Sequence, residues 1–367
     1  MRITIIGAGV MGLSAARALA GAGHTVTILD RGAIPHPGAA SVDAHRLIRF
    51  PYGREHGYAR MVSEAYGAWE RLWRDLGVSL YHPTGTLLLG RADHPWARDS
   101  VATLEGLGHV ARRLSPDEGA RAFPYLTFTD EDDIFFLDSG GLLFADRIMA
   151  ALADHAAALG VRLLPRTEAA AVDPARARVR LTDGRTLEAD LALIAAGAWA
   201  GRLAPALEGR MTPSRQTVCY VRVPSGMRMP WQKGPMILDI DPAAGFYLVP
   251  PAAGTPMKVG DHRFTLRGHP DDDRRVDPRE AARILALARP RLKHFERYRL
   301  ADAAACFYAV APDERFIVER IGRTWVLAGF SGHGFKFGPL FGERLAAVVD
   351  GSADASDFTR WCAGGVV

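Results

Sequence analysis

The chain contains 367 residues, of which 48% are hydrophobic, and its formal net charge is +4. This length and composition favour a globular protein of roughly two domains with a large core. Arginines scattered along the chain supply most of the positive charge, which favours a solvated basic surface over a nucleic-acid interface. No apolar run reaches the about 18 residues of a membrane span. The three cysteines, Cys219, Cys306 and Cys362, lack CxxC spacing, so we expect no metal site and no disulfide framework in a cytoplasmic protein.

The first predicted element is an apolar strand over residues 1–6, which leads directly into a G-x-G-x-x-G motif. The glycines of this motif are Gly7, Gly9 and Gly12. A helix is expected over residues 13–22 and a second strand over residues 25–30, ending on Asp30. In such a βαβ unit the glycines allow a tight turn, close approach of the backbone to a pyrophosphate, and close packing of helix on strand. Asp30 is expected to bind a ribose 2′-hydroxyl, so the motif predicts FAD or NAD rather than NADP.

The middle of the chain continues the alternation of helix and strand signals. Residues 142–159 predict a helix that Gly160 closes, and residues 161–165 predict a strand. A hairpin is expected to turn at Asp183–Gly184. A buried strand over residues 191–199 ends in small residues, which would let a cofactor approach the backbone. The N-terminal part therefore predicts a parallel sheet wrapped by helices.

The segment 215–302 differs, because short β-rich runs are separated by proline and glycine and are followed by a charged helix near residues 278–292. We expect a second domain with an antiparallel sheet. A strand, a glycine-rich loop and a helix over residues 325–349 then return to the first pattern. The prediction is an α/β fold with a discontinuous Rossmann-like domain and an α+β substrate domain. The expected bounds are 1–80, 142–210 and 308–367 for the cofactor domain, and 81–141 and 211–307 for the substrate domain.

Three sequences, GAGVMG at the N-terminus, LIAAGAW in the middle and GFSGHGFKF near the C-terminus, together resemble those of the D-amino-acid-oxidase superfamily of FAD enzymes. Within it, the chain resembles the monomeric sarcosine oxidase group along its full length. Further matching segments are RLIRFPYG from Arg46, KVGDH from Lys258, and CFYAVAPDE from Cys306. The resemblance implies a GR2-type FAD domain, and it implies that Cys306 carries FAD through a thioether at the flavin 8α-methyl group.

The resemblance also implies roles for the residues of a substrate site. Arg46 and Lys336 match the pair that binds the substrate carboxylate, for which an arginine fork is well suited. Lys258 matches the lysine beside the flavin that stabilises the charge formed when oxygen takes an electron. His262 matches the active-site histidine, which could titrate near neutral pH or hydrogen-bond the substrate.

Further matches concern the aromatic wall and the cofactor. Tyr247 and Tyr308 match the aromatic residues around the substrate pocket. Arg49 and Gly332 are expected at the cofactor, together with the N-terminal glycines and Asp30. Two positions depart from the family pattern, because His45 replaces the usual threonine and Asp261 stands where tyrosine is frequent.

The implied activity is oxidation of a secondary or N-methylated amino acid, or a cyclic imino acid, to an imine, with oxygen reduced to hydrogen peroxide. The departures at His45 and Asp261 make a larger or cyclic substrate as good a candidate as sarcosine. Two alternatives stay open: an oxidase or dehydrogenase of D-amino acids or glycine on the same fold, and an inactive FAD-binding redox module. The expected partners are a small amino acid with a carboxylate and molecular oxygen, in a monomer or small homo-oligomer.

Overall fold

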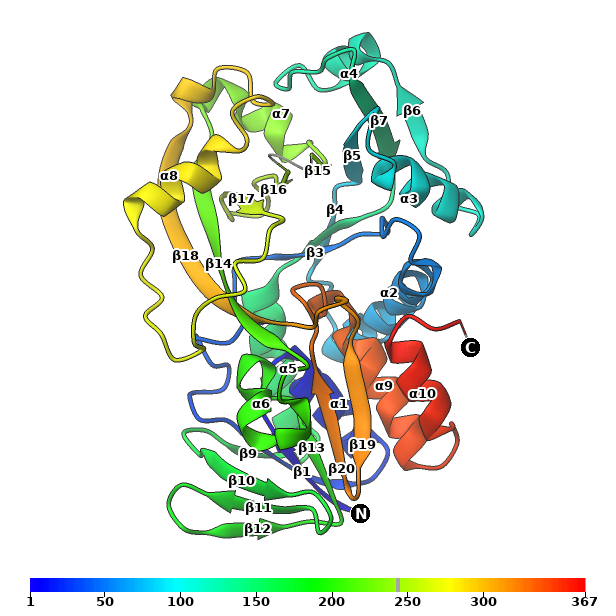
Figure 1. Ribbon diagram of the computed structural model, residues 1–367, viewed down its shortest axis with the longest axis vertical. Helices are drawn as coiled ribbons and strands as arrows, with labels where there is room; N and C mark the ends of the chain where they lie inside the picture. The colour runs from blue at the N-terminus through cyan, green and yellow to red at the C-terminus, as the bar shows by residue number, and fades with distance from the viewer. Residues whose placement is uncertain (242–244, 367) are drawn as a thin grey trace.

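The structure is a computed structural model, and it describes residues 1–241 and 245–366. Figure 1 shows two units stacked along the long axis, with a parallel sheet and its helices at the lower end and a larger sheet at the upper end. Both chain termini belong to the lower unit. This arrangement agrees with the expected mixed α/β architecture.

The lower unit is built on a six-stranded sheet in which every neighbouring pair is parallel except β19 and β20. In spatial order its strands are β19 (Ile317–Ile321), β20 (Thr324–Ala328), β13 (Leu191–Ile194), β1 (Arg2–Ile6), β2 (Thr25–Leu29) and β9 (Arg162–Leu164). Ile5 of β1 lies opposite Ile28 and Leu193, and all three are buried. The sheet therefore joins three distant parts of the chain, as the expected discontinuity requires.

The longer helices pack together on one face of this sheet, while a small antiparallel three-stranded sheet and one short helix cover the other face, so the expectation of helices around the whole sheet is correct for one face only. The helices are α1 (Val10–Gly21), α2 (His56–Leu76), α5 (Ala145–Ala158), α6 (Ala200–Leu203), α9 (Gly338–Val349) and α10 (Ala355–Cys362), with the 3-10 turns η1 (Gly197–Trp199), η2 (Pro205–Leu207) and η5 (Phe335–Phe337). The small sheet comprises β10 (Ala169–Asp173), β11 (Arg178–Leu181) and β12 (Thr186–Glu188). The predicted hairpin turn at Asp183–Gly184 is confirmed between β11 and β12.

The upper unit contains an eight-stranded sheet that is antiparallel except where β15 pairs with β5. In spatial order its strands are β18 (Arg299–Val310), β14 (Thr212–Arg222), β17 (Met257–Asp261), β16 (Phe246–Val249), β15 (Met236–Asp239), β5 (Thr86–Arg91), β7 (Asp132–Leu137) and β6 (Arg112–Leu114). Its helices are α3 (Trp96–Glu105), α4 (Pro116–Ala122), α7 (Arg228–Gln232) and α8 (Pro278–Ala286), with η3 (Ser225–Met227) and η4 (Phe295–Arg297).

A short sheet connects the two units. It consists of β3 (Arg46–Ile48), β8 (Gly141–Leu143) and β4 (Tyr81–Pro83), with β8 in the middle. Strand β18 is a second connection, because it runs from the upper sheet across the expected boundary at residue 308 toward the lower unit. Residues that follow β3 and β18 can therefore reach a space shared by both units.

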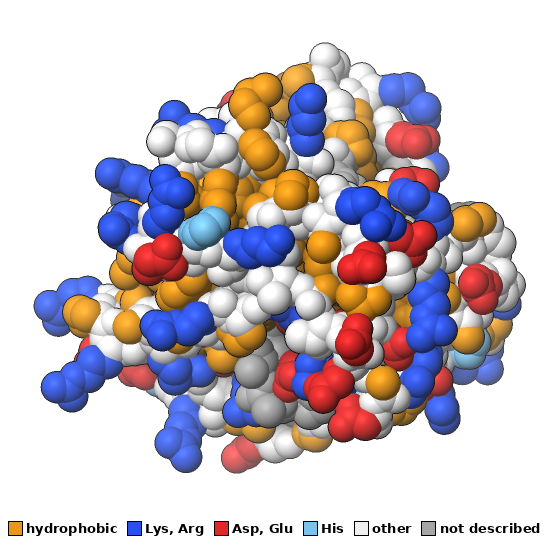
Figure 2. All heavy atoms as spheres, turned by 90° about the horizontal axis from the view of Figure 1, so that it is seen from above, with side chains coloured by type: hydrophobic (Ala, Val, Ile, Leu, Met, Phe, Trp, Pro, Cys, Tyr) orange, Lys and Arg blue, Asp and Glu red, His pale blue; other side chains and the backbone are white. Residues whose placement is uncertain are grey.

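The surface carries its charges in a dispersed pattern. Figure 2 shows the end of the molecule that bears the large sheet, where basic side chains spread over the face with acidic and apolar ones among them. In the part of the chain that the structure describes, no helix combines the length and apolar character that crossing a bilayer demands.

Candidate functional site

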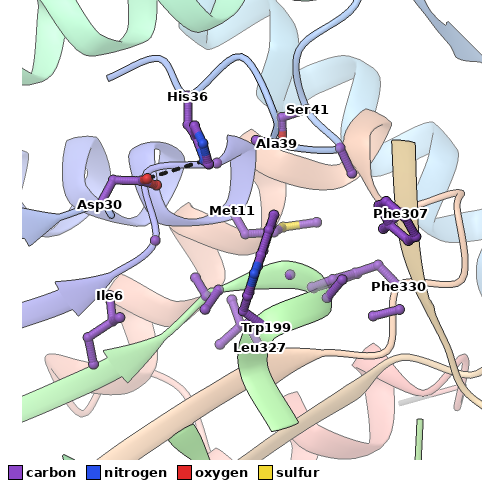
Figure 3. A pocket seen from close by; sticks show the side chains of 18 of the residues that line it. Ile6, Met11, Asp30, His36, Ala39, Ser41, Trp199, Phe307, Leu327 and Phe330 are labelled. Atoms are coloured by element: carbon purple, nitrogen blue, oxygen red, sulfur yellow. Dashed lines mark ion pairs between the residues drawn. The ribbon is translucent and has the colours of Figure 1, made fainter. Parts of the chain in front are cut away.

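A cavity of about 360 Å³ opens beside the carboxyl ends of β1 and β13. It is bounded by the glycine motif, the loop after β2, the segment after β13, the end of β18 and the loop after β20. Figure 3 shows Asp30 and His36 at one end, Phe307 and Phe330 at the other, and the Trp199 ring between them. Ligands of parallel α/β sheets bind at this edge, so the cavity lies where the sequence predicts the dinucleotide.

The backbone of the glycine motif fits a dinucleotide. Gly7 adopts φ +102°, and a Cβ there would lie 2.5 Å from the Ala195 oxygen. A Cβ on Gly12 would lie 1.9 Å from the Gly7 oxygen, so helix and strand pack too closely for any side chain. Gly9 is the N-cap of α1 and offers no capping side chain. The first turn of the helix therefore meets the cavity without a side chain from its N-cap, although the Val10 N–H donates to Ser41 Oγ at 3.0 Å, and this turn suits a pyrophosphate.

Asp30 fixes the turn and also lines the cavity. Its carboxylate accepts hydrogen bonds from the N–H groups of Ala8 and Gly32, each at 2.9 Å. His36 Nδ1 lies 3.4 Å from the same group, as the dashed line in Figure 3 marks. A carboxylate has about four lone-pair positions, so Asp30 keeps capacity for ribose hydroxyls. The cavity and its residues fit FAD.

Lys258 and Arg46 form one cluster with an aspartate that the sequence reading did not single out, Asp43. The Lys258 side chain is buried, and its Nζ donates to Asp43 Oδ2 at 3.0 Å and to the His45 carbonyl at 2.6 Å. Arg46, which lines the cavity, pairs with the same carboxylate oxygen. The Tyr220 hydroxyl donates to the other oxygen.

Lys336 lies in a second cluster and is held by neutral groups. Its Nζ donates to the Tyr52 hydroxyl at 2.9 Å and to the His333 carbonyl at 2.8 Å. His333 Nε2 lies 3.2 Å from the Glu314 carbonyl and must donate to it, so Nδ1 is left to accept from Tyr52 at 3.1 Å. Arg49 lies over the Tyr52 ring at 4.8 Å. Burial and the charge of Arg49 lower the pKa of Lys336.

The structure thus groups the cations differently from the sequence-based expectation, in which Arg46 shares the carboxylate with Lys336. It places Arg49 beside Lys336 and Arg46 beside Lys258. Arg46 is the first residue of β3, whereas Arg49 follows the end of this strand at Ile48, so different parts of the chain path position the two side chains. Among the residues that the structure describes, neither Arg49 nor Lys336 forms an ion pair, whereas Arg46 does.

His262 is neutral at physiological pH. Burial and the nearby Arg49 lower its pKa to about 4, which differs from the expectation of a group titrating near neutrality. The ring bonds to the Phe246 carbonyl, while Nε2 is buried and has no partner within the described residues. Because a carbonyl only accepts, the proton sits on Nδ1 and Nε2 is an acceptor. A buried acceptor that has no hydrogen-bond partner, such as this Nε2, indicates that a donor group binds there.

Tyr247 and Tyr308 face each other and share a hydrogen bond. Glycines make room for both rings: a Cβ on Gly260 would lie 2.3 Å from the Tyr247 ring, and one on Gly332 would lie 2.3 Å from the Tyr308 ring. Gly332 also adopts φ +76°. Tyr308 and Gly332 both line the cavity, so the aromatic wall extends from the cofactor site.

Cys306 lies in β18 directly before two cavity residues, Phe307 and Tyr308. Its thiol is free, as are those of Cys219 and Cys362. Burial raises the pKa of the Cys306 thiol, and the charges of Arg46 and Lys258 oppose this shift. Cys306 therefore lies close enough to Arg46 and Lys258 for their positive charges to affect its pKa.

A composition signal could have pointed to the two buried lysines. The chain has 45 basic residues, but only four are lysines: Lys233, Lys258, Lys293 and Lys336. A chain that uses arginine almost everywhere keeps lysine at both site positions, where a compact ammonium fits and a guanidinium fork does not. No sequence signal marks Asp43, Tyr52 or His333 as partners, because their contacts form only in the folded chain. No group of His, Cys, Asp and Glu arranged to hold a metal ion occurs within residues 1–241 and 245–366.

Comparison with known proteins agrees with this site. The family described as FAD dependent oxidoreductase (DAO) matches residues 2–348. Peroxisomal sarcosine oxidase of Mus musculus is 31% identical over 93% of this chain and 90% of its own. N-methyl-L-tryptophan oxidase of Citrobacter koseri is 27% identical over 97% of this chain and 96% of its own. The fold also matches L-proline dehydrogenase of P. horikoshii, with a TM-score of 0.83 at 20% identity, covering 100% of this chain and 99% of that one. The chain therefore belongs to the DAO family of FAD-dependent oxidoreductases and, like the sarcosine oxidases, acts on CH–NH bonds.

Proposed function

We propose that this protein is an oxidase of secondary or N-methylated amino acids, cyclic imino acids included, that passes electrons to oxygen and releases hydrogen peroxide. The observation that carries the proposal is a pair of cations, Arg49 and Lys336, that have no ion-pair partner within the described residues and lie near His262, whose buried Nε2 has no hydrogen-bond partner there. An amino acid offers the complementary groups, a carboxylate and an N–H.

The two cations would bind the substrate carboxylate. Lys336 uses two of its three N–H groups in hydrogen bonds to Tyr52 and His333, so one N–H is available to a ligand. The charge of Glu314 acts on Arg49 and opposes the lowering of its pKa by burial, but the two side chains form no ion pair. Burial disfavours the charged form of Lys336. A carboxylate that binds here offsets this effect, because a nearby negative charge favours the ammonium.

His262 would orient the amine. Nε2 can accept a hydrogen bond from the substrate N–H, which directs the nitrogen lone pair and the adjacent C–H bond away from the imidazole. Because the histidine is neutral, it places no positive charge beside an amine that must react as the free base. Tyr247, whose ring centroid lies 5.9 Å from that of His262, bounds the same space.

FAD, when bound, supplies the acceptor for the hydride equivalent and the path of electrons to oxygen. Arg46 lines the cofactor cavity and Lys258 is buried next to it, so the two would offer positive charge near the place where reduction of flavin and oxygen creates negative charge. In this proposal Lys258 acts in the oxygen half-reaction, while Lys336 acts in substrate binding. Each of the two lysines would therefore serve a different half of the reaction.

The identity of the substrate is tested by mixing the FAD-loaded protein with amino acids without oxygen and following the loss of flavin absorbance. The panel contains sarcosine, N-methyl-L-tryptophan, L-proline, glycine and D-alanine, each compared with its amide. We expect reduction by secondary amino acids and at least about tenfold weaker apparent binding of the amides, since they lack the charged carboxylate. Reduction by glycine and D-alanine alone would favour the D-amino-acid or glycine oxidase alternative. No reduction by any member would favour an inactive module.

A matched pair of variants tests the carboxylate site. Lys336→Met should raise the apparent dissociation constant of the best substrate about tenfold or more, because one of its two cationic partners is lost. Lys293→Met removes the same side chain outside this site and should leave binding unchanged. Equal affinities in both variants would remove Lys336 from the proposal.

Attachment of FAD through Cys306 is a separate part of the proposal. It is supported by the position of Cys306 next to two cavity residues on β18. Acid precipitation of the purified protein should leave the flavin absorbance in the pellet, and Cys306→Ala should release it to the supernatant. Cys219→Ala is the control, since Cys219 is buried in the core of the upper unit. Flavin that is soluble after precipitation of the unmodified protein contradicts the attachment.

A further inference from the structure

Asp43 lies in the loop between β2 and β3, where side chains from three separate strands meet it. They are Tyr220 of β14, Lys258 of β17 and Arg46 of β3. The Asp43 side chain is 6% exposed, and its carbonyl accepts the Asp146 N–H at the start of α5 at 2.9 Å. Both its backbone and its carboxylate are therefore held in place.

The charges in this cluster do not balance. Lys258 and Arg46 share a single carboxylate oxygen of Asp43, so two positive groups meet one negative group. Arginine stays protonated in proteins, so any loss of a proton must come from Lys258. Burial and the charge of Arg46 lower the pKa of Lys258, and the carboxylate at 3.0 Å opposes that shift.

The other groups that face Lys258 cannot replace this carboxylate. The charged and titratable groups around it are Asp43, Arg46, His45, Tyr220, Tyr247 and Cys306. The pKa of His45 is lowered to about 3, so its ring is neutral and adds no charge. The pKa values of Tyr247 and of the free Cys306 thiol are raised by burial, and a Cys306 thioether is uncharged, so neither residue adds a negative charge at physiological pH. Asp43 is then the anion in contact with Lys258.

We propose that Asp43 is a positioning residue that holds Lys258 as an ammonium beside Arg46, which lines the cofactor cavity. The proposal rests on the role of Lys258 in the oxygen half-reaction put forward above. It also explains why the two buried lysines differ. Lys258 has a permanent anion and keeps its proton in the absence of substrate, while Lys336 has neutral partners and waits for a carboxylate ligand.

The scarcity of lysine makes a direct test practical. With only four lysines in the chain, protein labelled with ¹³C at the lysine Cε gives one resolvable signal per residue in NMR spectra. Signals are assigned with the single variants Lys258→Met, Lys336→Met, Lys233→Met and Lys293→Met. Titration of the FAD-loaded protein between pH 6 and 11 then reports each lysine separately, without any measurement of turnover.

We expect Lys258 to titrate at higher pH than Lys336 in the unmodified protein, and a reversed order overturns the proposal without any variant of Asp43. In Asp43→Asn the Lys258 midpoint should fall by about two units, a hundredfold change in its dissociation constant, while Lys336 stays within about half a unit. Asp43→Glu should restore most of the shift. Tyr220→Phe, which removes a neutral hydrogen bond to the same carboxylate, should leave Lys258 charged. An unchanged Lys258 midpoint in Asp43→Asn overturns the proposal.

The oxygen reaction separates this inference from the function on which it rests. In Asp43→Asn the rate of flavin reoxidation should fall as pH rises through the new Lys258 midpoint, whereas the unmodified protein stays constant over that range. Lys258→Met should be slow at every pH, with substrate reduction much less affected. Reoxidation that is as fast in Lys258→Met as in the unmodified protein overturns the proposed role of Lys258, while the NMR result still decides whether Asp43 holds its proton.

Discussion

The Tyr52 hydroxyl determines where the Lys336 ammonium points. It accepts from Lys336 and donates to His333, whose other nitrogen donates to a main-chain carbonyl. Each hydrogen bond in this chain fixes the direction of the next, from the backbone to the ammonium. This series of hydrogen bonds contains no anion, so the Lys336 ammonium is oriented while its charge stays available to a ligand.

Removal of the Tyr52 hydroxyl should therefore weaken substrate binding more than turnover. Tyr52→Phe takes away one partner of Lys336 but keeps the ring between the two cations. We expect KM for a carboxylate substrate to rise about tenfold or more, since a hydrogen bond to a charged group contributes about 1.5–3 kcal/mol. The rate of flavin reduction at saturating substrate should change less than twofold.

Tyr58→Phe is the matched control. Tyr58 stacks on Tyr52 with ring centroids 5.5 Å apart, but its hydroxyl bonds to the backbone of Phe316 and Cys362. Loss of those bonds should lower stability without a change in KM. If both variants raise KM equally, general loosening of the aromatic cluster accounts for the effect, and the hydroxyl of Tyr52 has no special role.

At the scale of single residues, the sequence predicts which residues line the site better than it predicts which side chains contact one another. The motif places Gly7, Gly9 and Asp30 at the cavity, where the structure has them. It does not reveal that Arg49, rather than Arg46, lies beside Lys336, because that depends on the path of the chain after β3 ends at Ile48. The contact of Lys258 with Asp43 joins residues 215 positions apart and has no local pattern.

Helix α1 packs against β1 and α9 through glycines that admit no side chain. Besides Gly12, Gly338 and Gly342 of α9 face α1, where added Cβ atoms would lie 2.5 Å from Val10 and 2.4 Å from the Ser14 oxygen. Close packing of these elements sets the position of the first turn of α1, and with it the part of the cavity that suits a pyrophosphate.

Two alanine substitutions in α1 should have opposite effects. Gly12→Ala forces a Cβ against the Gly7 oxygen, so we expect loss of FAD binding and a destabilisation of at least about 2 kcal/mol. Gly21→Ala lies in the same helix with nothing within 4 Å, and should be neutral or stabilise by up to about 1 kcal/mol. Thermal unfolding and flavin content measure both effects. Equal stability of the two variants would contradict the packing argument.

Element types were predictable, but several ends were not. The helix expected from residue 142 begins at Ala145, because Leu142 and Leu143 pair in β8. The strand expected to reach residue 199 ends at Ile194, and Gly197 starts a 3-10 turn at φ +54°. The helix expected over residues 278–292 ends at Ala286. In each case tertiary pairing or a turn overrides the local apolar pattern.

For the whole molecule, the alternating βα pattern and the returning C-terminal signal predict the discontinuous parallel sheet, and the structure has it. The residue limits of the two domains stay a prediction. The β15–β5 parallel pair in the otherwise antiparallel sheet had no sequence signal, since it joins residues 150 positions apart in segments of ordinary strand composition. Strand direction in a sheet follows from the path of the chain, which short patterns do not encode.

Acid should destabilise the protein through its buried histidines. The pKa values of His45 and His262 are lowered to about 3 and about 4 from 6.5. Below pH 6.5 the unfolded chain binds protons at these positions while the folded one does not, so the free energy of unfolding falls as pH falls. Each such histidine contributes about 1.4 kcal/mol per pH unit over this range.

Denaturant unfolding at intervals from pH 7 to 4.5 measures this effect. His45→Gln keeps a side-chain N–H that can reach the Pro256 carbonyl, as His45 Nε2 does at 3.2 Å, but it cannot titrate. The difference in stability between the unmodified protein and the variant should shift by about 1.4 kcal/mol per unit below pH 6. Parallel curves would show that His45 is protonated in the folded state or is not buried there.

The position of β20 has a consequence for biosynthesis. The central strands β1 and β13 are synthesised early, but β20, which covers the other edge of β13, is made of residues 324–328 of a 367-residue chain. The loop after β20 closes the cavity. FAD therefore cannot be enclosed until β20 and the loop after it have been synthesised, and a growing chain that pauses earlier exposes an apolar strand edge to its neighbours. Flavin capture is therefore coupled to the pairing of β20 with β13.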